Sequence, residues 1–197
     1  MYFFKSFIAA AIVFLSVSLE ASAHAAISPV LGVSGTPVRS DVQRPTNARP
    51  CGRTNVADTF ETSDTITMDA DNTFNATITN FNKGVDGSRE IVSALVDVTG
   101  TGEQFDQTAT VQENGTRNPK DLGSEQLTIA LPQACSGGQD ENKCLVSLKT
   151  AGGFGNCVVV QNAAANVTTS TSAVRRHAAP RRLVRRRAGL SRLSDVE

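Results

Sequence analysis

Two short apolar runs, each opening on a cysteine and joined by a glycine-rich turn, constrain the fold of this chain most. The first run begins at Cys144 and the second at Cys157, and residues 152–155 form the turn between them. Apolar runs of this length, bounded by turn residues, are typical of short buried strands. With Cys51 and Cys135 upstream, they predict a small β-domain stapled by disulfides.

Four cysteines allow three pairings. Cys135 and Cys144 enclose a polar, turn-rich loop that two neighbouring strand ends would close. We therefore expect the pairs Cys135–Cys144 and Cys51–Cys157, the second closing a long loop worth about 4–5 kcal/mol in the chain-entropy model. Zinc is the competing use of four cysteines, but the spacings lack paired C-x₂-C knuckles.

The first 23 residues have the pattern of a secretory signal peptide. Lys5 precedes an apolar run from Phe7 to Leu19, and Ala21-Ser22-Ala23 has the small-x-small form of a cleavage site after Ala23. This run is shorter than the roughly 20 residues that a membrane span needs. We expect a secreted protein, extracellular or associated with a cell wall, without a membrane anchor.

Cleavage after Ala23 would place His24 at the mature amino-terminus. Its imidazole and α-amine would then form a chelating pair that suits copper. The only other histidine is His177. A carboxylate is the remaining candidate for completing a weaker site, from Asp41, Asp58 or Asp64. The competing interpretation is that a histidine simply follows the cleavage site.

Charge divides the rest of the chain into two parts. Residues 24–174 contain ten Lys or Arg against sixteen Asp or Glu, whereas residues 175–197 contain eight Arg against two acids. The break predicts a folded acidic domain over 24–162, followed by a Ser/Thr-rich linker and a disordered Arg-rich tail over 163–197. Clusters ending at Arg176, Arg182 and Arg187 are candidate cutting sites for a kexin-type protease. Alternatively, the tail is retained and binds anionic polymers.

Composition argues against several functions. The sequence has no Trp and a single Tyr, which lies in the signal peptide, so aromatic platforms for sugars or for nucleic-acid bases are lacking. A serine nucleophile needs a histidine base held in the fold, and only His24 is a candidate there. These observations predict a protein that does not bind nucleic acid, and they disfavour a serine hydrolase. Paired carboxylates for glycoside hydrolysis stay available among the sixteen acids, but no aromatic subsites accompany them.

The pattern of strands and turns predicts the architecture. Prolines mark residues 24–52 as an extended arm. Short runs with frequent turn signals follow, and helical periodicity is lacking. We predict an all-β fold, an antiparallel immunoglobulin-like β-sandwich of about seven strands. The expected strands are 65–68, 73–79, 91–98, 105–111, 126–131, 144–149 and 157–160.

Three Asn-x-Thr triplets are candidate N-glycosylation sites in an exported chain. They begin at Asn75, Asn114 and Asn166. Asn114 lies in a predicted turn and is the favoured site. We expect one or two of the three to carry glycan.

Several of these motifs together resemble the Egh-type (gEgh) secreted fungal proteins, a family that includes appressorium-associated virulence factors. The resemblance rests on His24, Pro50-Cys51-Gly52, residues 79–89, the run from Cys144 and residues 153–161. It implies a secreted or wall-associated protein at the fungal surface, with roles that include host contact and no established reaction. An amino-terminal histidine also resembles the copper brace of lytic polysaccharide monooxygenases.

The residues and the resemblance lead to one main hypothesis and one alternative. The main hypothesis is a non-catalytic secreted protein that contacts polymers of the cell wall or of a host surface. The alternative is a copper-binding protein, or a copper-dependent oxidase or monooxygenase, that uses His24.

Overall fold

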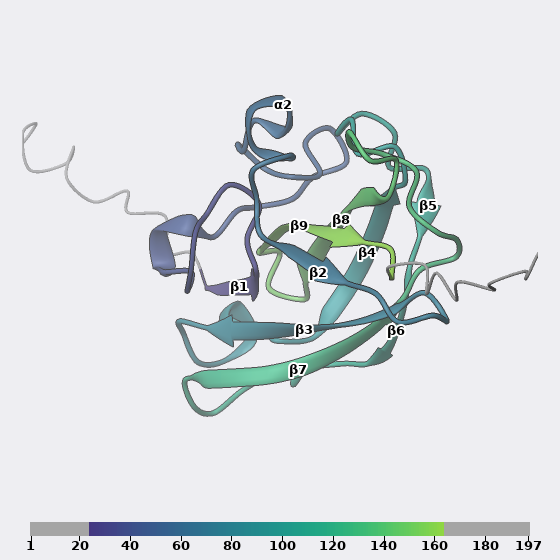
Figure 1. Cartoon of the computed structure of the whole chain (residues 1–197). Helices are drawn as coiled ribbons and strands as arrows, with labels where there is room; N and C mark the ends of the chain where they lie inside the picture. Colours follow the sequence, from purple (N-terminus) through teal and green to yellow (C-terminus); the bar gives the residue numbers. More distant parts are fainter. Residues whose placement is uncertain (1–23, 164–197) are drawn as a thin grey trace, which may run out of the picture. The chain divides into compact units, whose positions relative to one another are not determined.

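Two β-sheets packed face to face form the framework of residues 24–163, the part of the chain that this computed structural model describes (Figure 1). The first sheet has the order β1 (Ala25–Ser28), β3 (Thr73–Asn80), β7 (Gly123–Ala130), β6 (Thr110–Glu113). The second has the order β2 (Thr65–Thr67), β9 (Gly155–Gln161), β8 (Lys143–Thr150), β4 (Ile91–Asp97), β5 (Gln107–Thr108). Short helical turns, η1 (Arg39–Asp41), α2 (Val56–Thr59) and η2 (Val85–Gly87), lie in the connections.

The strand order confirms the predicted all-β sandwich of immunoglobulin type. β1-β3-β7-β6 reproduces the A-B-E-D sheet, and β9-β8-β4 reproduces G-F-C with β5 added at the edge. Every pair is antiparallel except β2 and β9, which run parallel. This parallel pair forms because a long segment separates β1 from β2, so that β2 joins the second sheet, not the first.

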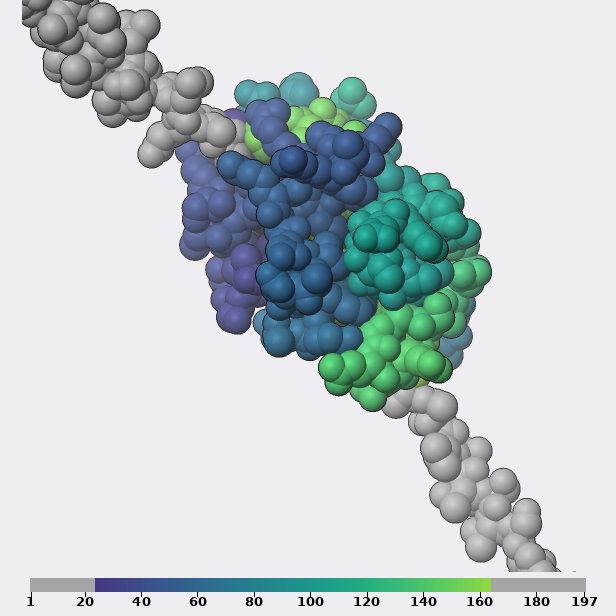
Figure 2. Space-filling model, turned by 90° about the horizontal axis from the view of Figure 1, so that it is seen from above, coloured from purple at the N-terminus to yellow at the C-terminus, as the bar shows by residue number. Residues whose placement is uncertain are grey.

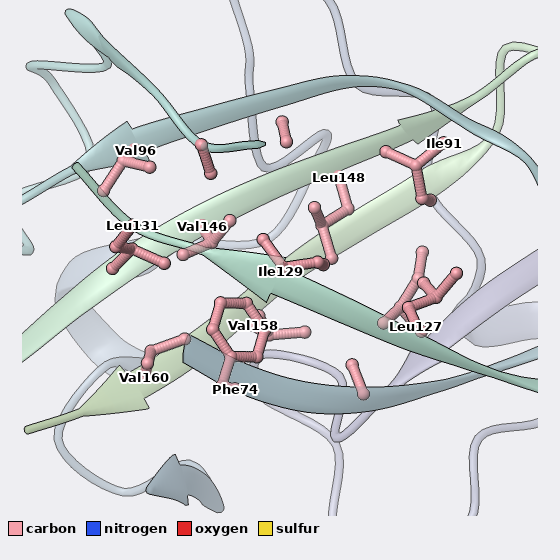
Figure 3. Close-up of a cluster of buried hydrophobic side chains, with 14 of the residues drawn as sticks. Phe74, Ile91, Val96, Leu127, Ile129, Leu131, Val146, Leu148, Val158 and Val160 are labelled. Carbon is pink, nitrogen blue, oxygen red and sulfur yellow. The ribbon is translucent and has the colours of Figure 1, made fainter. Parts of the chain in front are cut away.

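The main core lies between the sheets. The predicted period-2 face of β3 is buried, with Phe74 1% and Ile78 0% exposed, and it lies against Leu127 and Ile129 of the neighbouring strand. Figure 3 shows these side chains directed toward those of the second sheet. The facing residues drawn there include Ile91, Val96, Val146, Leu148, Val158 and Val160.

A second core lies on the outer face of the second sheet. Leu145 and Val159 point away from the sandwich interior and pack with Leu31, Cys51 and Phe60. The residues from 29 to 64, here called the covering segment, supply the last three. The strands β8 and β9 are therefore buried on both faces, and this is why they read as continuous apolar runs.

The start of the predicted extended arm differs from the expectation, because Ala25–Ser28 forms a strand. β1 pairs antiparallel with β3 along one edge. On the other side, the Asn156 side chain accepts a hydrogen bond from the Ile27 N–H and donates one to the Ile27 carbonyl, both at 2.8 Å. Four residues directly before Pro29 give too short a pattern to be distinguished from a proline-rich arm.

The predicted strand over 105–111 divides into two. β5 belongs to the second sheet and pairs with β4, whereas β6 belongs to the first and pairs with β7. Between them, Ala109 is buried and donates its N–H to the Ala94 carbonyl. An edge strand that changes sheets keeps an uninterrupted sequence pattern, so the periodicity did not reveal the break.

Both predicted disulfides are present. Cys51 is joined to Cys157 and Cys135 to Cys144, with a Cα–Cα distance of 5.0 Å in each. Two disulfides indicate an oxidising compartment. Within residues 24–163 there is no helix long and apolar enough to cross a membrane.

Candidate functional site

The covering segment and the β8–β9 turn enclose a cavity of about 330 Å³. This volume falls in the range of small-molecule sites, about 300–1,000 Å³. Of the ten residues that line it within the described chain, four are arginines and none is acidic: Arg39, Arg44, Arg49 and Arg53. We call this cavity, with Phe154 on its wall, the arginine pocket.

Contacts to the second sheet fix the backbone of the pocket. Gln43 exchanges two backbone hydrogen bonds with Gly155, at 3.0 and 3.1 Å. The buried Ser147 hydroxyl donates to the Pro50 carbonyl at 2.6 Å, and the adjacent Cys51 is tied to β9 by its disulfide. The segment that carries the arginines is therefore attached to the sandwich at three consecutive points. Figure 2 views this side of the molecule and shows the covering segment, in blue, at its surface.

Short local bonds hold the loops that bear Arg49 and Arg53. The backbones of Thr46 and Arg49 exchange two hydrogen bonds of 3.1 Å, and the Thr46 hydroxyl accepts a further bond from the Arg49 N–H. The Gln43 side-chain oxygen accepts a hydrogen bond from the Arg53 N–H at 3.0 Å. Both arginine side chains thus project from an ordered backbone.

Within residues 24–163 the four guanidinium groups lack carboxylate partners. The ion pairs found within residues 24–163 use Arg89, Arg117 and Lys143 instead. Arg39 donates to the Phe81 carbonyl at 3.2 Å, and the guanidinium carbon of Arg44 lies 4.0 Å from the ring centroid of Phe154. Hence none of the four arginines forms an ion pair with an acid of the described chain.

His24 lies directly behind the wall of this pocket. Its ring centroid is 4.4 Å from that of Phe154, and the residue is 5% exposed. Burial lowers the pKa of His24; Asp86 raises it, and the positive charges of Arg39 and Arg44 lower it further. The ring is therefore kept in its neutral form more readily than an exposed histidine.

The residues around His24 do not fit a copper centre. Its buried Nδ1 has no hydrogen-bond partner among residues 24–163, which leaves one donor atom available. However, the described chain contains no group of three or more His, Cys, Asp or Glu that could hold a metal, and two nearby arginines oppose a cation. Asp41 accepts a hydrogen bond from the Val38 N–H, and Asp58 accepts one from the Asn55 side chain, so neither the charge nor the donor set of a copper brace is assembled.

The candidate glycosylation sites are placed differently. Asn75 is exposed on β3, and its side-chain oxygen accepts a hydrogen bond from Thr128. The Asn114 amide is bound to the backbone of Ile91, accepting from its N–H at 2.7 Å and donating to its carbonyl at 2.9 Å. Both side chains are exposed, and they differ in the amide nitrogen that would carry the glycan: within residues 24–163 that of Asn75 makes no hydrogen bond, whereas that of Asn114 donates to Ile91. This difference leads us to expect glycan on Asn75, whereas the predicted turn position favoured Asn114.

Several predicted sites lie outside the described residues. These are the cleavage site at Ala23, the acceptor Asn166, His177 and the basic clusters ending at Arg176, Arg182 and Arg187. The Asp64 side chain, a third carboxylate considered for copper, belongs to the described part and makes no ion pair there.

Sequence reasoning did not find the arginine pocket. The four arginines recur at intervals of four or five residues through a proline-rich stretch, which is the one available signal. Whether such residues share a site depends on how the covering segment folds back on β9. Phe154 reaches the same place from a turn about one hundred residues later.

Comparisons of the chain with protein-family models, with curated proteins and with solved structures gave no match. The site is accordingly interpreted from its own geometry. The class that the fold defines is an immunoglobulin-like sandwich with two disulfides and a third, covering layer.

Proposed function

We propose that this protein is a non-catalytic, secreted surface or cell-wall protein of the Egh-like fungal type, which binds polymers of the wall or of a host surface. The observation that carries the proposal is the arginine pocket, a cavity of ligand size on a backbone fixed by a disulfide and by hydrogen bonds. A fixed backbone lowers the entropy cost of binding. The signal-peptide pattern and the oxidising compartment indicated by the disulfides support export.

Binding to isolated walls tests the proposal. The secreted protein is mixed with fungal and plant wall preparations, and its depletion from solution is measured together with release of soluble or oxidised sugars. Ser40→Trp fills the pocket lining, whereas Thr110→Trp adds the same ring on β6, away from the pocket. We expect the wild-type protein to be depleted from solution without release of sugars. Ser40→Trp should reduce this depletion, and Thr110→Trp should not. No depletion on any wall, or sugar release that depends on the protein, would contradict the proposal.

The copper alternative makes a different prediction. It is favoured by the unpaired Nδ1 of His24 and opposed by the incomplete donor set. Copper titration of protein that begins at His24 distinguishes the two. We expect a dissociation constant weaker than about 10 μM, or about 7 kcal/mol of binding, and nanomolar binding lost in His24→Ala would instead support the alternative.

A further inference from the structure

We propose that the arginine pocket is a binding site for acidic polysaccharides, chains whose sugars carry carboxylate or sulfate groups. This inference rests on the proposed function and names its ligand class. The chemistry shared by both kinds of polymer is a series of anionic groups along a sugar chain. Guanidinium groups suit both, because their planar N–H donors match carboxylate and sulfate oxygens in paired hydrogen bonds.

The arginine cluster carries a cost for the folded protein. Four cations share one cavity, and no carboxylate lines it within the described residues. Like charges brought together raise the local potential and destabilise the compact state. A cluster of like charges that opposes folding and has no partner in the protein is expected at a functional site, where the compensating charge comes from a ligand.

The arginine pocket contrasts in charge with the rest of the domain. Residues 24–174 contain ten basic against sixteen acidic residues, and four of the ten basic residues line this one pocket. An acidic surface repels a polyanion elsewhere. Binding is therefore confined to the pocket instead of being spread over the domain.

The four arginines differ in how available they are to a ligand. Arg44 lies on the Phe154 ring and Arg39 holds the Phe81 carbonyl, so both also contribute to the wall of the site. Arg49 and Arg53 are exposed, and within residues 24–163 their guanidinium groups make neither an ion pair nor a hydrogen bond. These two arginines are the ones free to bind an anion.

The wall of the pocket favours a sugar acid over a nucleic acid. Phe154 is 2% exposed and its ring is covered by Arg44 and His24, so no aromatic face is offered to a base. The disulfides also indicate a compartment in which wall polymers and glycans are the abundant polyanions.

The test uses the full secreted chain, because its basic tail must be present in every sample. Probes are a galacturonate trisaccharide, a sulfated trisaccharide, the neutral glucose trisaccharide and a short DNA duplex. The test variant is Arg49→Gln with Arg53→Gln. The matched control is Arg117→Gln with Lys120→Gln, which removes the same charge from exposed residues outside the pocket.

Calorimetry and thermal unfolding are measured at about 0.05 and 0.15 M salt. We expect one or both acidic trisaccharides to bind and raise the unfolding temperature, with the neutral one inactive and the affinity falling as salt rises. The pocket variant should lose at least tenfold in affinity, the control less than twofold. Without ligand, the pocket variant should unfold at the same temperature or higher, because repulsion is relieved.

Four results would overturn the inference. Equal losses in both variants would assign binding to total charge and the tail. Preference for DNA would redirect the site to nucleic acid. Binding of walls or neutral sugars without any acidic trisaccharide would leave the proposed function standing and remove this ligand class. A lower unfolding temperature of the unliganded pocket variant would show that the arginines serve the fold.

Discussion

The His24 ring lies 4.4 Å from the Phe154 ring, centroid to centroid, with the two planes inclined by 39°. These residues are 130 positions apart, at the start of the described chain and in the β8–β9 turn. Phe154 also carries the Arg44 guanidinium. The first residue of the predicted mature protein thus lies behind the Phe154 wall of the arginine pocket, and its contribution is packing.

Stability should depend on pH through His24. Burial, the largest cause, lowers the pKa of His24 below its ordinary value of 6.5, so the unfolded state binds this proton more readily. The free energy of unfolding should rise with pH up to about 6.5 and gain nothing more from this group above it. Urea unfolding of the wild type and of His24→Asn at pH 5 and pH 7 measures the difference.

The His24→Asn variant should show a smaller loss of stability between pH 7 and pH 5 than the wild type. Asp86→Asn serves as the control, because Asp86 raises the His24 pKa and its removal should enlarge the loss. Identical pH profiles for the wild type and His24→Asn would show that burial does not shift the pKa of the imidazole.

Asp97 should be the acid-sensitive residue of the β4–β5 connection. Its carboxylate is fully buried and accepts hydrogen bonds from the N–H groups of Gly100 and Gly102 and from both donors of Thr99, among others. Burial alone raises the pKa of Asp97, but these hydrogen bonds outweigh it and lower the pKa below 3.8. The stability it contributes is present above pH 3.8 and is lost as pH falls through the depressed value.

Replacing Asp97 tests this role. Asp97→Asn should cost about 2–4 kcal/mol at pH 7, because an amide places a donor against backbone donors and removes charge-assisted bonds. The exposed Asp106→Asn is the control and should change stability by less than about 0.5 kcal/mol. Equal effects of the two substitutions in denaturant unfolding would refute the assignment.

The two disulfides should contribute different amounts to the free energy of unfolding. Cys51–Cys157 spans 106 residues and Cys135–Cys144 spans 9. The chain-entropy model assigns about 4–5 kcal/mol to the long loop and about 2–3 kcal/mol to the short one. Double alanine variants of each pair, compared by urea unfolding, measure this order. The long-loop variant should also lose affinity for acidic trisaccharides, because it releases the pocket backbone, and the short-loop variant should keep it.

Glycan should be found on Asn75 in preference to Asn114. The glycan mass is measured as the difference in intact mass before and after enzymatic removal of N-glycans. This difference should fall in Asn75→Gln and stay at the wild-type value in Asn114→Gln. In unglycosylated protein, Asn114→Gln should cost about 1–2 kcal/mol, because two hydrogen bonds to the Ile91 backbone are lost. Loss of glycan in Asn114→Gln alone would reverse this assignment.

Parts of the fold were predictable because local patterns encode them. The alternation of Phe74, Ala76 and Ile78 marked a strand with one buried face, and the runs from Cys144 and Cys157 marked strands buried on both faces. The polar loop between Cys135 and Cys144 predicted that these two cysteines pair, which left Cys51 to pair with Cys157. In each case the information lies within a few residues, or within the length of one loop.

β1 and the β5–β6 switch were not predictable in the same way. The position of β1 depends on Asn156, whose side chain binds Ile27 across 129 residues. The change from the second sheet to the first at Ala109 depends on which sheet edge has an unpaired strand at that position. Neither relationship leaves a periodic trace in the sequence.

The sequence by itself determined a disulfide-stapled, all-β domain, because hydrophobic period, turn residues and cysteine spacing are local properties. Only the tertiary structure decided where a ligand would bind. It folded a proline-rich segment back over the second sheet, brought four arginines to one cavity and closed that cavity with Phe154. That arrangement depends on contacts such as Gln43–Gly155 and Ser147–Pro50, which join residues about one hundred positions apart and have no local signature.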